Sequence, residues 1–109
     1  MILLSHRIQI FDSNGNFLRK FGYGGSGDGQ FSYLSGVAIN FKGLHHEIIV
    51  ADNNNHRIQI FDSEGNFLKK IEGIYHPYGV AINSRGNLIV CEAIRLKNVY
   101  IIHISIIYI

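Results

Sequence analysis

A thirteen-residue segment occurs twice in this chain, and no other feature of the sequence limits the fold as strongly. HRIQIFDSNGNFL at 6–18 returns 50 residues later as HRIQIFDSEGNFL at 56–68, and the only difference is Asn14 against Glu64. Near-identity over this length does not arise by chance. The two segments are therefore copies of one structural unit.

Two shorter matches extend the repeat beyond this segment. GVAIN at 36–40 returns at 79–83, and the aliphatic run at 48–50 returns at 88–90. The offsets fall from 50 to 43 to 40 residues, so the copies differ in length within two Gly-containing stretches, where loops tolerate deletion. The repeat length is that of a unit of about 40–45 residues.

Each copy has the period-two pattern of a β-strand. In the RIQIF segment of the second copy, Ile58 and Ile60 fall on one face of the strand. The residues on the other face are Arg57, Gln59 and Phe61. A tight hairpin turn is expected after this segment, because the first copy has Asn-Gly there, the strongest short hairpin signal.

These patterns predict four short antiparallel strands in one repeat, at 36–40, 47–52, 57–62 and 66–72. No segment has the 3.6-residue period of an amphipathic helix, so we expect almost no helix. Four-stranded units that recur every 40–45 residues or so are typical of β-propeller blades. A small all-β barrel is the alternative, although a barrel does not need parts that are alike in sequence. We therefore expect an all-β fold of about two to two and a half four-stranded blades, an incomplete propeller.

Composition excludes several classes of protein. The 109 residues include one cysteine, Cys91, so the chain has no intramolecular disulfide framework and no cysteine-rich zinc site. Its net charge is only +2, whereas a dedicated nucleic-acid-binding domain usually has a clear basic excess. No apolar segment approaches the roughly 20 residues that span a bilayer. We expect a soluble or peripheral chain in the cytoplasm, with no membrane partner.

The repeat resembles the NHL repeat, a propeller-blade sequence. The resemblance rests on GVAIN at 36–40 and on IVADNNNHRIQIFDSEGNFL at 49–68, and it covers about residues 6–92. The stretch GSGDGQF at 25–31 is similar to the loop between blades in TRIM-NHL proteins. The third copy departs from the pattern at 91–95, where CEAIR replaces ADNNN.

Four segments follow from this alignment. Residues 6–22 are expected to form the outer half of a blade, 31–73 a complete repeat, 74–104 a degenerate repeat and 105–109 an apolar tail. The resemblance implies a closed ring of usually six blades, because closure is what removes exposed strand edges. We therefore expect a fragment of a longer protein, or a chain that associates with copies of itself through open blade edges.

The apolar end of the chain has two interpretations. In the first, the true reading frame or exon ends near Lys97, and residues 98–109 are not genuine coding sequence. In the second, 98–104 is a degenerate third strand and 105–109 a rudimentary fourth. The sequence favours neither.

No catalytic constellation is visible. The glycines of 22–27 match G-x-G-x-x-G, but a strand is predicted after them, where a dinucleotide site needs a helix N-terminus. Asp52 and Glu92 correspond to each other in successive copies, and a group that recurs once per blade usually serves the blade, by accepting hydrogen bonds near a turn. Cys91 lies in an apolar strand and is expected to pack as a small hydrophobic residue.

The six histidines do not form a metal-binding motif. His45 and His46 are adjacent, so they would point to opposite faces of a strand. His6 and His56 occupy equivalent positions of two copies, whereas zinc needs three or four converging ligands. We expect no metal and no cofactor.

A binding surface has better support. In propellers, the loops between second and third strands and the connectors between blades lie on one face. Asn offers donors and acceptors, Tyr and His offer rings for stacking, and Arg reaches phosphate or carboxylate. The candidate partner-binding residues on these loops are Asn53, Asn54, Asn55, His56, Arg57, Tyr75, His76 and Tyr78. The alternative is that the Asn-rich loop only makes a turn and that Arg57 pairs with a carboxylate such as Asp52.

The resemblance to TRIM-NHL proteins implies a propeller that recruits RNA or protein partners. The resemblance also implies that the parent protein is often a ubiquitin ligase. That activity belongs to RING, B-box and coiled-coil segments, which residues 1–109 do not contain. We therefore expect a non-catalytic binding scaffold for protein or single-stranded RNA, and no DNA partner. Two alternatives stay open: part of an NHL-type propeller enzyme with a metal-dependent, lyase-like activity, and a nonfunctional truncated product.

Overall fold

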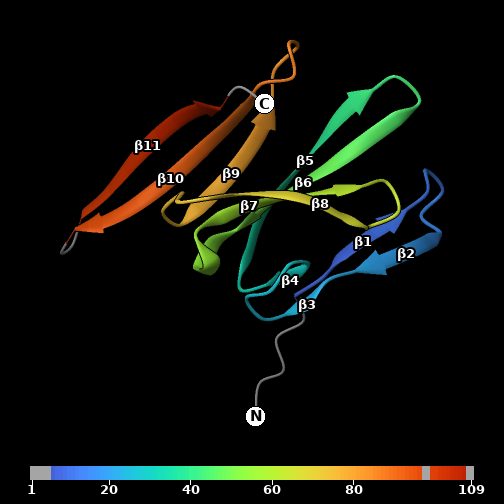
Figure 1. Cartoon of the computed structure of the whole chain (residues 1–109), viewed down its shortest axis with the longest axis horizontal. Coiled ribbons are helices and arrows are strands. Elements are labelled where there is room, and N and C mark those ends of the chain that lie inside the picture. Colours follow the sequence, from blue (N-terminus) through green and yellow to red (C-terminus); the bar gives the residue numbers. More distant parts are fainter. Residues whose placement is uncertain (1–5, 97–98, 108–109) are drawn as a thin grey trace.

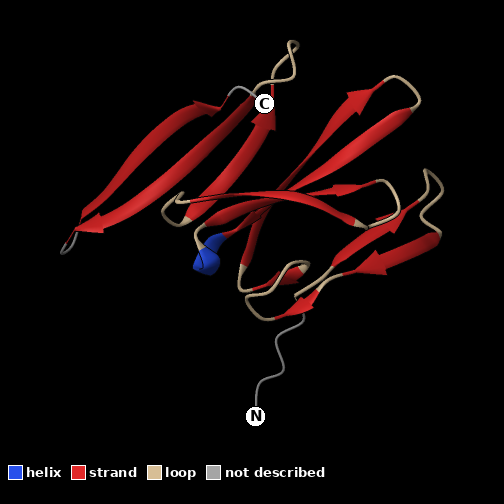
Figure 2. Cartoon of the chain, in the orientation of Figure 1, coloured by secondary structure: helices blue, strands red, loops and turns tan. Residues whose placement is uncertain are grey.

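A computed structural model describes residues 6–96 and 99–107. Within these residues the chain is all-β, with strands and one 3₁₀ turn and no α-helix, as predicted (Figure 2). The elements in chain order are β1 (Ile8–Phe11), β2 (Phe17–Phe21), β3 (Tyr23–Gly24), β4 (Gln30–Phe31), β5 (Leu34–Lys42), β6 (His45–Asp52), η1 (Asn53–Asn55), β7 (Arg57–Asp62), β8 (Phe67–Glu72), β9 (Pro77–Ile82), β10 (Leu88–Leu96) and β11 (Val99–Ile107).

The central sheet has the order β5-β6-β7-β8 and is antiparallel throughout, which makes it a complete propeller blade. The four predicted strands are all present, and β7 has the predicted bounds. The other three differ at their ends: β5 is longer at both ends, β6 begins at His45 instead of residue 47, and β8 begins at Phe67 instead of residue 66. Phe41 and Lys42 continue the ladder because they pair with His46 and His45 across the hairpin.

Two smaller sheets flank the central blade, and Figure 1 shows the three in chain order. On one side β1 and β2 form a hairpin, and on the other β9, β10 and β11 form a three-stranded sheet. The short parallel pair β3-β4 belongs to the loop between the first and central sheets. The fold is therefore a partial propeller, as the resemblance to the NHL repeat implies.

The third sheet differs from the central blade where the sequence departs from the repeat. β6 ends at Asp52 because three asparagines follow and form η1. β10 instead runs on to Leu96, because Ala93, Ile94 and Arg95 replace those asparagines and pair with residues of β11. β11 is one strand from Val99 to Ile107, so it runs through the boundary expected between a repeat and a tail at 104–105. The expectations for residues 97–98 and 108–109 lie outside the described residues.

Adjacent sheets pack face to face through two apolar clusters. The alternation predicted for the RIQIF segment is confirmed, because Ile58 and Ile60 face the third sheet while Phe61 faces the first. Buried members of the cluster toward the third sheet are Ile49, Ala51, Ile58, Ile60, Ile74, Leu88 and Val90. Buried members of the cluster toward the first sheet are Phe31, Ile48, Val50 and Phe61. The inner strands also approach closely: a Cβ on Gly36 would lie 2.8 Å from the carbonyl oxygen of Tyr78.

The hairpin between β7 and β8 is closed by one carboxylate. Asp62 Oδ1 accepts hydrogen bonds from the backbone N–H groups of Glu64 and Asn66, both at 2.9 Å, and Oδ2 accepts one from Asn66 Nδ2 at 3.0 Å. Gly65 takes the left-handed conformation that the turn requires, with φ of 89°. The same bonds recur at Asp12 in the first copy.

These hydrogen bonds lower the pKa of Asp62 below its ordinary value of 3.8, chiefly through the backbone N–H and then the side-chain amide of Asn66. Because the folded-state pKa is lowered, the turn's contribution to stability is present above the unfolded-state pKa and is lost as the pH falls through the folded one. Asn66→Ala should therefore raise the pKa of Asp62 and leave that of Asp12 unchanged in a carboxyl ¹³C NMR titration. Equal pKa values for Asp62 before and after the change would contradict this explanation.

Candidate binding surface at the blade junctions

A buried polar group, which we call the polar clamp, consists of Asp52, Arg57 and Gln59. All three side chains lie on the face of the central blade that packs toward the first sheet, and they are at most 3% exposed. Arg57 Nε donates to Asp52 Oδ2 at 2.8 Å, and Gln59 Nε2 donates to the same oxygen at 3.1 Å. The ion pair between Arg57 and Asp52 that the sequence left as an alternative is therefore present.

The polar clamp fixes the loop between the first sheet and the central blade. Arg57 donates to the carbonyl oxygens of Gly27 and Gln30 at 2.8 and 2.9 Å. Gln59 Oε1 and Asp52 Oδ1 accept the N–H groups of Gly29 and Ser32 at 2.9 and 2.8 Å. The G-x-G-x-x-G stretch is thus followed by β4 and is held by the blade behind it. The Arg57 guanidinium is used inside the chain and is not presented on the surface.

Three of the predicted residues come together at the junction of the central blade and the third sheet. We call His56, Tyr75 and His76 the junction cluster. The rings of His56 and Tyr75 are stacked, with centroids 5.1 Å apart and an interplanar angle of 15°. His76 meets both rings edge-on, at 4.3 Å from His56 and 4.5 Å from Tyr75. Tyr75 is 49% exposed, so the cluster presents an aromatic surface to solvent.

The histidine of each copy also has a structural role. The backbone N–H of His76 donates to His56 Nδ1 at 3.1 Å, and the N–H of Tyr33 donates to His6 Nδ1 at 3.3 Å. Both donors have positive φ, 40° for His76 and 61° for Tyr33, so the two connectors bend in the same unusual way. An acceptor at Nδ1 places the ring proton on Nε2.

The three asparagines of η1 have separate environments. Asn53 is 3% exposed, and its amide bonds the Pro77 carbonyl oxygen at 3.0 Å and His76 Nδ1 at 3.0 Å. Asn55 Nδ2 donates to the Gly25 carbonyl oxygen at 2.9 Å. Asn54 is exposed. Asn53 and Asn55 thus support the connectors on either side, and Asn54 is the asparagine that faces solvent.

The remaining candidate, Tyr78, begins the third sheet in β9 and is 43% exposed. The predicted set therefore divides into two groups. Exposed or half-buried residues stand at the surface: Asn54, Asn55, His56, Tyr75, His76 and Tyr78. Arg57 and Asn53 are buried and engaged within the chain.

A hollow of about 400 Å³ lies at the first sheet and was not predicted as a site. It is lined by His6, Arg7, Lys20, Phe21, Gly22, Tyr23 and Gly24. Arg7 is the copy of Arg57 and is exposed, and the sequence has Ile2 at the position that corresponds to Asp52. The repeat alignment could have indicated this exposed arginine, because only the second copy has the three residues of the polar clamp in its sequence.

Neither a metal-binding group nor a membrane-spanning helix is present within residues 6–96 and 99–107. No group of three or more His, Cys, Asp or Glu side chains in this part of the chain is arranged to hold a metal ion. Over the same residues, no helix has the length and apolar character that crossing a bilayer requires.

Comparisons with known proteins agree with the geometry. The family model of the NHL repeat matches residues 31–61. Protein brain tumor of Drosophila melanogaster is 39% identical over 91 residues, which is 81% of this chain and 9% of that protein. The chain thus spans less than a tenth of the length of this relative, a TRIM-NHL protein. The chain belongs to the NHL-repeat family.

Proposed function

We propose that the chain is part of a non-catalytic NHL propeller scaffold that recognises single-stranded RNA or a protein segment at its blade junctions. The observation that carries this proposal is the junction cluster, in which a stacked histidine and tyrosine stand at the surface. The same proposal includes a TRIM-NHL-like parent protein associated with a ubiquitin ligase. It also includes a location in the cytoplasm. They are supported by the resemblance alone.

Hydrogen bonds from η1 connect the two junctions. η1 lies between them, because Asn53 and Asn54 donate their backbone N–H groups to the carbonyl oxygens of Tyr33 and Ser32, while the Asn53 side chain reaches Pro77. A ligand that lies across η1 therefore meets an aromatic cluster on one side and the exposed cation Arg7 on the other. Lys20 lines the same hollow as Arg7.

This combination suits single-stranded RNA. Bases stack on aromatic side chains, and cations track the phosphates. The stacked pair of His56 and Tyr75 offers the first interaction, and Arg7 with Lys20 offers the second. A net charge of only +2 implies that stacking contributes a large share of the affinity.

Tyr75→Ala should weaken the binding of a fluorescein-labelled oligouridine, measured by fluorescence anisotropy, by about 5- to 150-fold. This range corresponds to the 1–3 kcal/mol or so that one base stacked on an aromatic ring contributes. The matched control is Phe17→Ala, which removes a ring that is also half exposed but lies in β2.

Two results would decide against RNA. One is equal affinity for the Tyr75 and Phe17 variants, and the other is the absence of any anisotropy change with the unaltered chain at low salt. Binding should also weaken as salt rises, because cation–phosphate contacts release counterions.

A protein segment is the second candidate ligand at the same surface. Its support is the exposure of Tyr78 and Asn54, because tyrosine and asparagine are adaptable contacts at protein interfaces. Crosslinking through a photoreactive group placed at position 54 would identify such a partner. Recovery of RNA instead of protein in the crosslinked product would reject this candidate.

A further inference from the structure

The central blade holds a short stretch of the interblade loop, GDGQF at 27–31, against one of its faces. The polar clamp bonds the backbone of this stretch, and Lys70 Nζ lies 2.9 Å from Oδ1 of its acidic residue, Asp28. The ring of Phe31, which ends the stretch, lies 5.6 Å from the ring of Phe61. The side chains of β7 and β8 that contact the stretch are thus Arg57, Gln59, Phe61 and Lys70.

The first sheet repeats these four side chains at an offset of 50 residues. Three of them alternate along the HRIQIF segment, and the fourth, on β2, pairs with Gln9. Ile8 and Ile10, which lie between the three, pack instead toward the central blade. All four therefore share the face of the β1–β2 hairpin that is turned away from that blade. We call this set the open face: Arg7, Gln9, Phe11 and Lys20.

The open face is accessible where its counterpart in the central blade is covered. Its four side chains are exposed, and Phe11 is 53% exposed against 1% for Phe61. A hollow of about 400 Å³ lies beside Arg7 and Lys20, the counterparts of the two cations that hold the loop. In Figure 1 the β1–β2 hairpin lies at the edge of the molecule. The first sheet thus has the side chains that hold a GDGQF stretch and room beside them.

The charge of the open face calls for an acidic ligand. In the central blade, Asp52 lies 2.8 Å from one of the two cations, and Glu72 lies 3.5 Å from the other. The sequence of the first copy has Ile2 and Gly22 at these two positions. The open face therefore has two cations and no carboxylate of its own, so a complementary ligand must bring the negative charge.

The other two side chains of the open face suit a peptide. Gln59 Oε1 accepts the N–H of Gly29 at 2.9 Å, and its Nε2 donates to the carbonyl oxygen of Gln30 at 2.6 Å. Gln9 has the same acceptor and donor. Gly29 has a φ of 79°, a conformation that requires glycine in the bound stretch. An inorganic phosphate would use the two cations but neither the amide of Gln9 nor the ring of Phe11.

We propose that the open face is a docking site for a glycine-rich acidic segment of another polypeptide, with the pattern Gly-Asp-Gly-Gln-Phe. Its aspartate meets Lys20, its backbone carbonyl groups meet Arg7, and its phenylalanine packs on Phe11, as 27–31 does on the central blade. The site shares Arg7 and Lys20 with the path proposed for RNA. It does not include the junction cluster, and it does not depend on RNA binding.

The test uses the full chain and the acetylated, amidated peptide GSGDGQFS, which has the sequence of residues 25–32. Binding is followed by ¹H–¹⁵N NMR, and the matched ligand is GSGNGQFS. We expect the acidic peptide to shift the amide signals of Gln9 and Lys20, and the Asn version to bind about fivefold more weakly, the upper range for one exposed ion pair. Arg7→Gln should weaken the acidic peptide about tenfold, because it removes charge-assisted hydrogen bonds.

Two variants of neighbouring residues locate the contacts. Lys20→Gln should weaken the acidic peptide to the level of the Asn version and leave the Asn version unchanged, because the two changes remove the same ion pair. Arg19→Gln removes the adjacent cation of β2, which faces Glu64 of the central blade at 3.8 Å, and should leave the affinity unchanged. A loss for Arg19→Gln as large as that for Lys20→Gln would show only nonspecific attraction by positive charge and would overturn the proposal.

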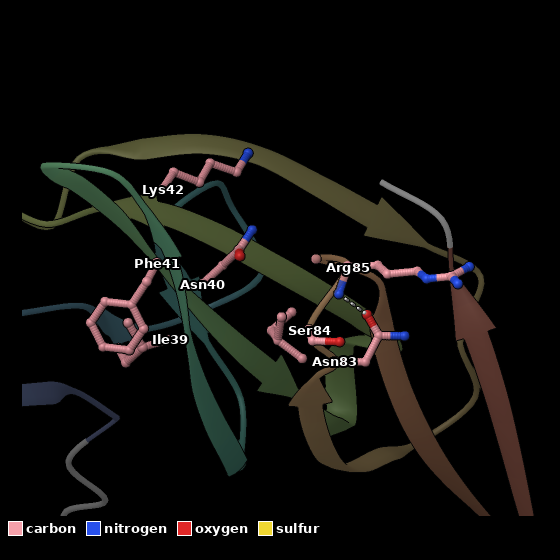
Figure 3. Close-up of a pocket in the computed structure, with 9 residues that line it drawn as sticks. Ile39, Asn40, Phe41, Lys42, Asn83, Ser84 and Arg85 are labelled. Carbon is pink, nitrogen blue, oxygen red and sulfur yellow. Dashed lines mark hydrogen bonds between the residues drawn. The ribbon is translucent and has the colours of Figure 1, made fainter.

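A larger pocket, of about 510 Å³, supplies a control far from the open face. It lies between the β5–β6 and β9–β10 hairpins, as Figure 3 shows. Its side chains on β5 alternate between the two faces of that strand, so they do not form one surface for a ligand. Arg85 at its rim is exposed. Arg85→Gln should therefore leave the affinity for GSGDGQFS unchanged, and an equal loss for Arg85→Gln and Arg7→Gln would contradict docking at the open face.

The remaining outcomes identify other occupants. A peptide that shifts the Gly29 amide instead of Gln9 would be exchanging with the chain's own loop. A dimer in light scattering that Gln9→Ala dissociates would place a second copy on the open face. Either result, equal binding of both peptides, or displacement by inorganic phosphate would overturn the proposal.

RNA binding is separated by two further variants. Phe11→Ala should weaken GSGDGQFS and leave the affinity for oligouridine unchanged, whereas Tyr75→Ala should do the reverse. Equal losses of both ligands in Phe11→Ala would assign the open face to RNA and overturn the peptide proposal. The failure of either proposal is thus visible without the other.

Discussion

Arg57→Ala is expected to reduce the free energy of unfolding by about 3–5 kcal/mol, the usual cost of removing one partner of a buried ion pair. The change leaves Asp52, a fully buried carboxylate, without its cation, and it also leaves the Gly27 and Gln30 carbonyl oxygens without their guanidinium donor. A small domain is stable by only about 5–15 kcal/mol, so the variant should be close to unfolding.

The repeat supplies a matched control for this experiment. Arg7 occupies the equivalent position of the first copy, in the same HRIQIF context, but it is exposed and has no partner carboxylate in the described chain. Arg7→Ala should therefore cost no more than about 0.5 kcal/mol. Urea unfolding followed by circular dichroism would compare the two variants, and equal losses of stability would mean that the polar clamp does not hold the fold.

A second readout separates local from global effects. The Gly29 N–H is bonded to Gln59 within the clamp, so its hydrogen exchange reports directly on the loop. In Arg57→Ala this amide should exchange faster than the amides of β6, because the loop loses its anchor before the blade opens. A double variant that replaces Asp52 and Arg57 with apolar residues should lose less stability than the two single losses added together.

The repeat alone was enough to predict the central blade. Its four strands, the hairpin turn at Asp62 and the two-faced pattern of Ile58 and Ile60 depend on local sequence, and the structure has them where they were expected. The departure of the third copy at 91–95 also indicated where its sheet would differ. The lengths of β10 and β11 could not be predicted from the repeat, because the extension of a strand depends on the presence of a partner strand.

The candidate site was less predictable, because burial is a tertiary property. Asn53 and Arg57 are polar and lie next to a turn, which suggested surface exposure, yet the neighbouring connectors cover both. The structure brings His56 beside Tyr75 and His76, and the hydrogen bond from the His76 N–H to His56 Nδ1 depends on the positive φ of His76.

Phe61→Ala should also cost about 3–5 kcal/mol, the usual loss when a buried phenylalanine is truncated. Phe61 is 1% exposed, and its ring lies 4.9 Å from that of Phe21 in the first sheet and 5.6 Å from that of Phe31 in the interblade loop. It therefore joins two sheets and the loop between them. Truncation should open a cavity at the centre of the apolar cluster between those sheets.

The equivalent change in the first copy isolates the tertiary part of this cost. Phe11 meets Phe17 edge-on at 5.9 Å, as Phe61 meets Phe67 at 6.0 Å, so the local aromatic pair is the same in both copies. Phe11 is 53% exposed, and Phe11→Ala should cost only the 1 kcal/mol or so of an aromatic pair. If thermal or urea unfolding gave both variants the same loss, the stability of the blade would reside in its hairpins. The larger loss expected for Phe61→Ala would instead show that contacts between blades hold the fragment together.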